Sequence, residues 1–392
     1  MKFVINRKRM LEAAKTAAKV APKNSPVEVL NGIFVECNEN TGNVFLTATS
    51  FDVSIQLKTS GTVEASGEFL INAKMLVEML NLFENETVTF SAERPERLKI
   101  STGRSKYILN CLSPKSYPKP VMPYPEDSVS MRGICSLAKR TVFAVGKDEN
   151  KLAFQCVNVS IKDNAVHAVA SDGGMRMMLI KDSAGPAVEQ SFMLPGKSLD
   201  LLASTSSDTD VFEVGDIGKE VVFVRGDMIF SIRKMNTGAY IDTNTLIQKL
   251  KPIYSAVVNV SKFEEALEIM AVSALAGGSR APVNMAFSKN EIVLCCNSDY
   301  SIGNTSVAAK INEPTPEKGF YYDISALLKL LDVVSGKIIV EMDARGFMLI
   351  KTKSEVYMQA PTRQPAKKVV PTSEPKKEKA RAKGAREMKE VA

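Results

Sequence analysis

The stretches "FLINAKMLVEML" (69–80), "FMLPGKSLDLLA" (192–203) and "FYYDISALLKLL" (320–331) share one pattern. Each reads as the end of a strand, a turn or capping residue, and then a short amphipathic helix. Lys74 aligns with Lys197 and Ser325, at offsets of 123 and 128 residues. Self-similarity at such a spacing indicates a repeated domain.

Two further segments keep the same spacing. The aligned residues are Tyr107, Phe230 and Tyr357 in one segment, and Thr49, Ser171 and Ser298 in the other. Three copies of one domain are the simplest interpretation. The expected domains are 1–125, 126–250 and 251–363, followed by a tail at 364–392.

Each copy mixes helical and strand patterns. The segment "RKRMLEAAKTAAKV" (7–20) follows a candidate N-cap at Asn6, and "GIFVECNENTGNVFLTATS" (32–50) shows the alternation of strands. The pattern predicts an α+β unit with about two helices on a sheet. Because every copy offers the same sheet edge, head-to-tail joining into a closed ring with the helices on one side is favoured.

Composition and charge narrow the class of protein. Hydrophobic residues make up 45% of the 392 residues, and no apolar run approaches 18 residues. The first residues lack the apolar core of a secretion signal, so we expect the protein to be cytoplasmic. Of the net charge of +7, residues 364–392 hold nine Lys or Arg and four Glu. This tail lacks aromatic residues, and we expect it to be disordered.

Residues for catalysis or metal binding are sparse. None of the six cysteines forms a C-x-x-C pair, and the single histidine, His167, lies in a strand pattern, so we expect buried thiols, no metal site and no cofactor. Gly196-Lys197-Ser198 resembles the end of a phosphate-binding loop, but Ser191 stands where that loop needs glycine. An enzyme is not expected, and a nucleotide-binding enzyme using this segment is the remaining catalytic alternative.

Basic side chains recur on the first helix of two repeats. Lys8, Lys15 and Lys19 fall within about 40° of one another, and Arg140 and Lys147 are arranged in the same way. This pattern favours a polyanion partner, with a solvated helix face as the alternative. The third repeat has Glu264, Glu265 and Glu268 instead, and Arg280 in "AGGSR" is a candidate phosphate contact.

The turn Asp172-Gly173-Gly174 lies between two apolar runs. Such glycines either cradle a phosphate or supply the positive φ angles of a hairpin. The residues alone leave both interpretations open.

Several longer segments carry a resemblance to a known family. "ISTGRSKYILNCLSPKSYP" (100–118), "ASDGGMRM" (170–177), "GDMIFSIRKMNTGAYID" (226–242) and "YMQAPTR" (357–363) occur in the family's order and spacing. On these segments, residues 1–363 resemble the bacterial sliding clamp, the beta subunit of DNA polymerase III. The resemblance implies a non-catalytic homodimeric ring with sheets outside and helices around duplex DNA. The DNA-facing residues are then predicted to be Lys8, Lys15, Lys19, Lys23, Arg140, Lys147, Lys197 and Arg280.

The resemblance also implies two protein-binding surfaces. It puts Arg104, Tyr107 and Leu275 at the subunit interface. Polymerases, clamp loaders and repair factors would insert a short apolar peptide into a pocket between the second and third repeats, with the Asp172-Gly173-Gly174 hairpin at its rim. The matching pocket residues are Phe154, Ser171, Gly173, Arg176, Met177, Ile241, Leu246, Gln359, Ala360, Pro361, Thr362 and Arg363.

The chain departs from the family at several points. "ASDGGMRM" has one residue more than the family segment, Ile241 stands where proline is common, and Gln359-Ala360 replaces a more apolar pair. The function expected is a DNA sliding clamp that binds duplex DNA without sequence preference and tethers the DNA polymerase III alpha subunit. The alternative is a clamp-like adaptor that does not encircle DNA. The basic tail is expected to contact DNA, with pocket competition or an inert extension as alternatives.

Overall fold

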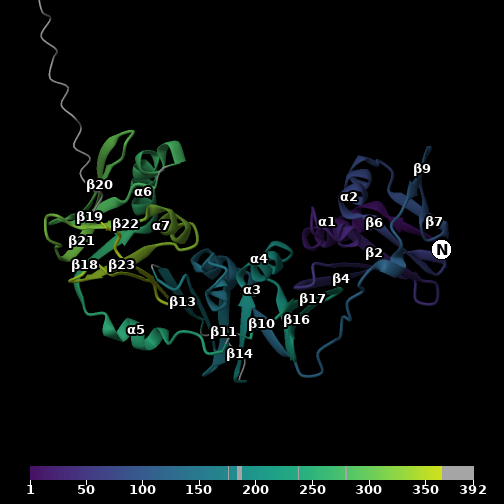
Figure 1. The fold of residues 1–392 in the computed structure, drawn as a ribbon, viewed down its shortest axis with the longest axis horizontal. Helices are drawn as coiled ribbons and strands as arrows, with labels where there is room; N and C mark the ends of the chain where they lie inside the picture. The colour runs from purple at the N-terminus through teal and green to yellow at the C-terminus, as the bar shows by residue number, and fades with distance from the viewer. Residues whose placement is uncertain (175, 183–187, 237, 279, 364–392) are drawn as a thin grey trace, which may run out of the picture.

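The computed structural model describes residues 1–174, 176–182, 188–236, 238–278 and 280–363. The predicted tail at 364–392 lies outside these residues. Three lobes follow one another along an open arc (Figure 1). The first lobe carries β1 to β9, the middle lobe β10 to β17, and the third lobe β18 to β25.

Helices α1, α3, α4 and α7 lie on the concave side of the arc, and strands such as β14, β16 and β18 lie on the convex side (Figure 1). The helices are α1 (Arg7–Val20), α2 (Ala73–Leu82), α3 (Ile134–Thr141), α4 (Gly196–Ser204), α5 (Thr243–Lys249), α6 (Val260–Ala274) and α7 (Ile324–Leu331). Asn6 caps α1 as predicted, because its side chain accepts a hydrogen bond from the Arg9 N–H. The predicted α+β class is confirmed.

The strands form three antiparallel sheets. The first has the order β5 (Thr62–Ala65), β1 (Lys2–Asn6), β7 (Thr87–Arg94), β8 (Arg97–Thr102) and β9 (Ser105–Asn110). The second has the order β10 (Val129–Arg132), β15 (Val211–Ile217), β16 (Glu220–Arg225), β17 (Met228–Arg233), β4 (Val53–Ser60), β3 (Asn43–Thr49), β2 (Gly32–Asn38) and β6 (Gly67–Asn72).

The third sheet joins the middle and third lobes. Its order is β14 (Gln190–Pro195), β11 (Cys156–Lys162), β12 (Ala165–Ser171), β13 (Arg176–Asp182), β25 (Glu355–Gln359), β24 (Met348–Lys351), β23 (Lys337–Asp343), β18 (Pro252–Asn259), β21 (Ile302–Glu313), β20 (Glu291–Asn297), β19 (Val283–Phe287) and β22 (Phe320–Tyr322).

Both lobe junctions use the same kind of strand pair. The last strand of one lobe pairs antiparallel with the fourth strand of the lobe before it, as β17 with β4 and β25 with β13. Phe230 therefore opposes Ile55, and Tyr357 opposes Met178. Continuous sheets across the junctions satisfy the backbone hydrogen bonds of strands that would otherwise be exposed edges.

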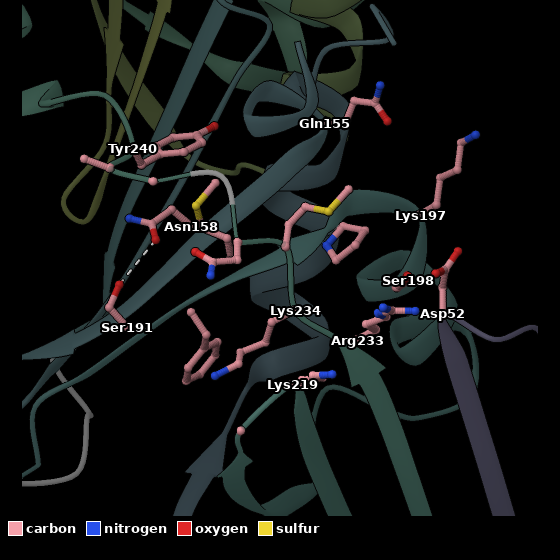
Figure 2. Close-up of a pocket in the computed structure, with 18 residues that line it drawn as sticks. Asp52, Gln155, Asn158, Ser191, Lys197, Ser198, Lys219, Arg233, Lys234 and Tyr240 are labelled. Carbon is pink, nitrogen blue, oxygen red and sulfur yellow. Dashed lines mark hydrogen bonds between the residues drawn. The ribbon is translucent and has the colours of Figure 1, made fainter. Parts of the chain in front are cut away.

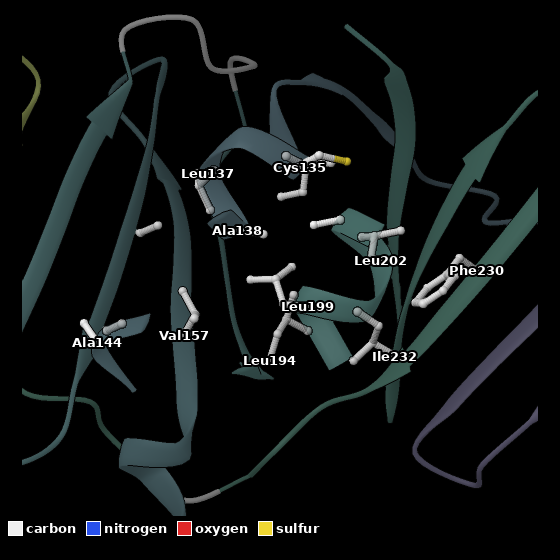
Figure 3. Close-up of a cluster of buried hydrophobic side chains, with 14 of the residues drawn as sticks. Cys135, Leu137, Ala138, Ala144, Val157, Leu194, Leu199, Leu202, Phe230 and Ile232 are labelled. Atoms are coloured by element: carbon white, nitrogen blue, oxygen red, sulfur yellow. The ribbon is translucent and has the colours of Figure 1, made fainter. Parts of the chain in front are cut away.

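The core of the middle lobe shows why its helices sit between two sheets. Leu137 and Ala138 of α3 pack with Leu199 and Leu202 of α4, and Phe230 lies against them from the sheet (Figure 3). All five side chains are almost completely buried. Apolar residues three or four positions apart on each helix create this inward stripe.

Candidate functional site

The turn between β12 and β13 is a hairpin, as the resemblance implies. The Asp172 N–H donates to the Arg176 carbonyl at 3.2 Å, and Gly173 has a φ of 79°. Oδ1 of Asp172 accepts from the N–H groups of Gly174 and Arg176, and Oδ2 accepts from Nε of Arg176 at 2.9 Å. Burial alone would raise the pKa of Asp172, but the hydrogen bonds from Arg176 and Gly174 outweigh it and lower the pKa.

Tyr240 holds this turn against the body of the middle lobe. Its hydroxyl accepts from the Ser171 N–H at 3.1 Å and donates to the Cys156 carbonyl at 3.2 Å. Its ring meets that of Phe154 edge to face, at 6.2 Å between centroids. Gly173 lies so close to Phe154 that a Cβ there would be 2.7 Å from two ring carbons. The turn therefore requires glycine for both its φ and its packing.

The third lobe approaches the turn through β25. Arg176 opposes Gln359, and Met177 opposes Met358. The Gln359 side chain donates to the Asp323 carbonyl at 2.8 Å, and the N–H of Thr362 donates to the Tyr321 carbonyl at 2.7 Å. These bonds hold the segment that leads from Gln359 to Arg363 beside the hairpin.

Four of the residues predicted to line the pocket are buried, namely Ser171, Met177, Gln359 and Ala360. Met177 is fully buried, and Gln359 is 1% exposed. The prediction that Met177 contacts the peptide is wrong, because packing on its face of the sheet encloses the side chain completely. Ala360 is also buried, whereas Pro361 and Thr362 are half-buried and Arg363 is exposed.

The connection between the middle and third lobes contributes Ile241 and Leu246. Ile241 is half-buried directly after Tyr240, and Leu246 is exposed on α5, which lies in that connection (Figure 1). The structure thus brings Phe154, Ser171, Gly173, Arg176 and Gln359 together through contacts, while Leu246 belongs to a separate helix.

Most of the predicted DNA-facing side chains are free to reach solvent. Exposed members are Lys8, Lys15, Lys19, Lys23, Lys147, Lys197 and Arg280. Lys19 also donates from Nζ to the Ser204 carbonyl, which links the end of α1 to the end of α4.

Arg140 corrects one of these predictions. Its Nη1 lies 2.6 Å from Oε1 of Glu355, and the two side chains are only 18% and 9% exposed. The guanidinium is thus used at the junction between the middle and third lobes. It is not presented to DNA.

Apolar side chains are exposed at both ends of the arc. Tyr107 and Ile108 of β9 are 44% and 59% exposed, and Arg104 is exposed in the turn before them. At the other end, Leu275 is 37% exposed after α6, and Ile302 is 81% exposed at the start of β21.

A cavity of about 1030 Å³ lies on the other side of Tyr240. Its wall includes Lys197, Lys219, Arg233 and Lys234 from the middle lobe and Asp52 from the first lobe (Figure 2). The Lys197-Ser198 pair of the candidate phosphate-binding loop is part of this wall. The cavity was not predicted from the sequence.

Tyr240 is the main pocket residue that sequence reasoning missed. A signal for it exists, since Tyr117 precedes Tyr240 by 123 residues, the spacing already found for Tyr107 and Phe230. Tyr117 makes the same kinds of contact as Tyr240. Its hydroxyl donates to the Thr47 carbonyl at 3.4 Å, and its ring stacks on that of Phe34 with 5.5 Å between centroids. Burial raises the pKa of both hydroxyls.

All six cysteines are free, four of them are buried and Cys111 and Cys295 are half-buried, and His167 lies in β12. Within the described ranges, no cluster of three or more His, Cys, Asp or Glu side chains could hold a metal ion. The helices of those same ranges include none that is long and apolar enough to cross a membrane.

The three-lobed arc, its paired junctions and its exposed ends define a protein of the sliding-clamp fold. Its first 123 residues match the family described as DNA polymerase III beta subunit, N-terminal domain. A beta sliding clamp of Staphylococcus epidermidis is 23% identical over 327 residues, which cover 80% of this chain and 84% of that one. The beta sliding clamp of Bacillus subtilis is 24% identical over 313 residues, covering 76% and 81%.

Solved structures agree with the fold. The DNA polymerase sliding clamp from Bacillus subtilis superposes with a TM-score of 0.82 at 24% identity, covering 93% of this chain and 99% of that one. The DNA polymerase III beta subunit from Thermotoga maritima gives 0.81 at 19% identity, with the same coverage. The chain thus matches the DNA polymerase III beta subunit N-terminal domain over residues 1–123 and is similar to bacterial beta sliding clamps over most of its length.

Proposed function

We propose that this chain is a DNA sliding clamp in which two copies join head to tail as a closed ring around duplex DNA. Each copy contributes three clamp domains, at 1–125, 126–250 and 251–363. The ring has no catalytic chemistry of its own and acts in the cytoplasm as a processivity factor. It keeps a polymerase on DNA by topology, so its individual phosphate contacts stay weak enough to exchange.

The complementarity of the two chain ends carries this proposal. Inside the chain, the last strand of a lobe pairs with the fourth strand of the lobe before it, at both junctions. The same pairing for the first lobe needs a third-lobe strand from another copy, because β9 is a terminal strand and the fourth strand of the third lobe is β21. If this junction has the same register as the two junctions inside the chain, Tyr107 would oppose Gly303 of the partner subunit.

Exposed apolar side chains at both ends support the same junction. Leu82, at the end of α2, is 81% exposed beside the β9 end, and Val272, near the end of α6, is 76% exposed beside β21. Exposed apolar surface of this kind marks a protein interface. Burying it would remove two exposed sheet edges in each copy and leave a closed ring with none at the junctions.

The concave helices supply the DNA-facing surface. Lys8, Lys15 and Lys23 on and after α1, together with Lys147, Lys197 and Arg280, would contact phosphates of either strand without reading bases. The carboxylates of α6 reduce the positive electrostatic potential of the third lobe. One of them, Glu265, forms an ion pair with Lys262 at 2.9 Å. Modest, salt-sensitive attraction suits a ring that must slide.

The hairpin at Asp172 is the proposed partner pocket. Phe154, Gly173 and Arg176, with Pro361, Thr362 and Arg363, would receive a short apolar peptide, while buried Met177, Gln359 and Ala360 support them. Ile241 and Leu246 would contact the same peptide from the connection to the third lobe. The partners would be the DNA polymerase III alpha subunit, the clamp loader, and other polymerases and repair proteins.

Sedimentation velocity tests the assembly. At micromolar concentration the 42.8 kDa chain should sediment as a dimer. A single monomeric species across that range would contradict the ring.

A further inference from the structure

The cavity beside Tyr240 is a second concave site at the junction of the first and middle lobes. Its walls come from β14 and the start of α4, from the β15–β16 turn at Gly218-Lys219, and from residues 233–236 and 238–240 at and after the end of β17 (Figure 2). Asp52 of the β3–β4 turn closes it from the first lobe. Its volume of about 1030 Å³ is at the upper end of the range of sites for small molecules.

The charge of the wall is strongly asymmetric. Four cationic side chains, Lys197, Lys219, Arg233 and Lys234, stand against the single lining carboxylate Asp52. Lys234 is paired with Asp216 at 2.6 Å. Lys197, Lys219 and Arg233 are exposed, and none of these three forms an ion pair with another residue that the structure describes. The free cations favour an anionic ligand.

A strand edge lies along the same wall. β14 is the terminal strand of its sheet, and it pairs with β11 on one side only. On the other side the Met193 carbonyl accepts from the N–H of Met235 at 3.0 Å. Because backbone groups alternate in direction along a strand, the N–H and C=O of Ser191 also face outward, toward the cavity that Ser191 lines.

We infer that this cavity binds an acidic, extended peptide segment of a protein partner. The peptide would add to the β14 edge at Ser191, and its carboxylates would reach Lys219 and Arg233. The site is separate from the proposed partner pocket, although Tyr240 borders both, and its occupation does not require the ring to form.

The aromatic residues argue for carboxylates over a single-stranded nucleic acid. Binding of single strands relies on rings that are free to stack with bases. In this cavity Phe192 is 3% exposed, and the ring of Tyr240 is engaged with Phe154. Cationic side chains and backbone edge groups are therefore what the cavity offers to a ligand.

A direct test uses a fluorescein-labelled peptide of four Glu-Thr repeats and a Lys-Thr peptide of equal length, with the full chain at low salt. We expect the acidic peptide alone to bind, and to slow amide exchange at residues 190–195 and 233–236. The variant Lys219→Glu/Arg233→Glu should weaken its binding at least tenfold. The charge-matched control Lys289→Glu/Lys318→Glu alters exposed positions in the third lobe and should bind as the wild type does.

The outcomes separate the ligand classes. Equal loss of affinity in both double variants, or protection of other segments, would overturn the site. A labelled oligo-dT that binds more tightly than the acidic peptide, and loses that binding in Lys219→Glu/Arg233→Glu, would overturn the choice of a peptide. None of these readouts depends on DNA encirclement, so they leave the proposed clamp function untouched.

Discussion

Nη1 of Arg140 in α3 lies 2.6 Å from Oε1 of Glu355 in the hairpin of the third lobe. The pair connects positions 215 residues apart and is largely withdrawn from water. Nε of the same guanidinium donates a hydrogen bond to a second oxygen, the Ser136 carbonyl, at 3.3 Å. The junction between the middle and third lobes is therefore held by an ion pair as well as by the β13–β25 ladder.

Removing one partner of this pair should destabilise the junction. Arg140→Ala leaves Glu355 as an unpaired, mostly buried carboxylate, and we expect the free energy of unfolding to fall by about 3 kcal/mol. Urea unfolding followed by circular dichroism measures the change. The matched control is Lys139→Ala, whose partner Asp208 is exposed, and it should cost less than about 1 kcal/mol. Equal effects of the two substitutions would contradict this account of the junction.

The hairpin turn should make stability depend on pH. Hydrogen bonds lower the pKa of Asp172 in the folded chain, so its carboxylate stabilises the fold fully above the ordinary carboxyl pKa of about 4. The stabilisation is lost as the pH falls through the lower, folded pKa. The difference in free energy of unfolding between wild type and Asp172→Asn should therefore shrink from pH 7 toward pH 3. Asp163→Asn, in an exposed turn, is the control, and a constant difference for Asp172→Asn would refute the prediction.

Gly173 should be more sensitive to substitution than another glycine of positive φ. In Gly173→Ala the new methyl group would lie 2.7 Å from carbons of the Phe154 ring, whereas at Gly226, with a φ of 51°, nothing lies within 4 Å. Gly226→Ala should therefore cost only the backbone strain, roughly 1–2 kcal/mol. Gly173→Ala should cost more and displace Phe154, which weakens binding of an apolar pocket peptide. Fluorescence anisotropy with a labelled peptide checks this, and unchanged affinity in Gly173→Ala would remove Phe154 from the pocket.

Charges at either end of the arc should prevent assembly. Tyr107→Asp in β9 or Ile302→Asp in β21 would put a carboxylate into the proposed junction, and each variant should sediment as a monomer while keeping the wild-type circular dichroism spectrum. Val121→Asp changes an apolar residue between the first and middle lobes that is as exposed as Ile302, and this variant should stay dimeric. A dimer in both end variants would show that copies associate through another surface.

Sequence patterns predicted individual helices and turns, because residues close together in the chain determine them. The helix at 7–20 was found from its period and from Asn6, and the Asp172 turn from its glycines together with the family resemblance. The role of Arg140 was missed because Glu355 reaches it only through the fold. The burial of Met177 was missed for the same reason, since β13 becomes an interior strand only when β25 of the third lobe pairs beside it. The sequence alignment of Ser171 with Ser298 is one residue away from the structural alignment. The Ser298 hydroxyl accepts from the Tyr300 N–H, as the Ser171 hydroxyl accepts from the Gly173 N–H. In the register of the strand pairs, however, Ser298 occupies the position of Asp172.

Topological retention on DNA tests the central claim most directly. The chain is loaded onto nicked circular duplex DNA with a clamp loader and ATP, the complex is isolated by gel filtration, and half of it is linearised with a restriction enzyme. A ring should stay on the circle in high salt and slide off the linear DNA through its ends, because only topology holds it there. Equal retention on both forms, or equal loss from both, would contradict encirclement.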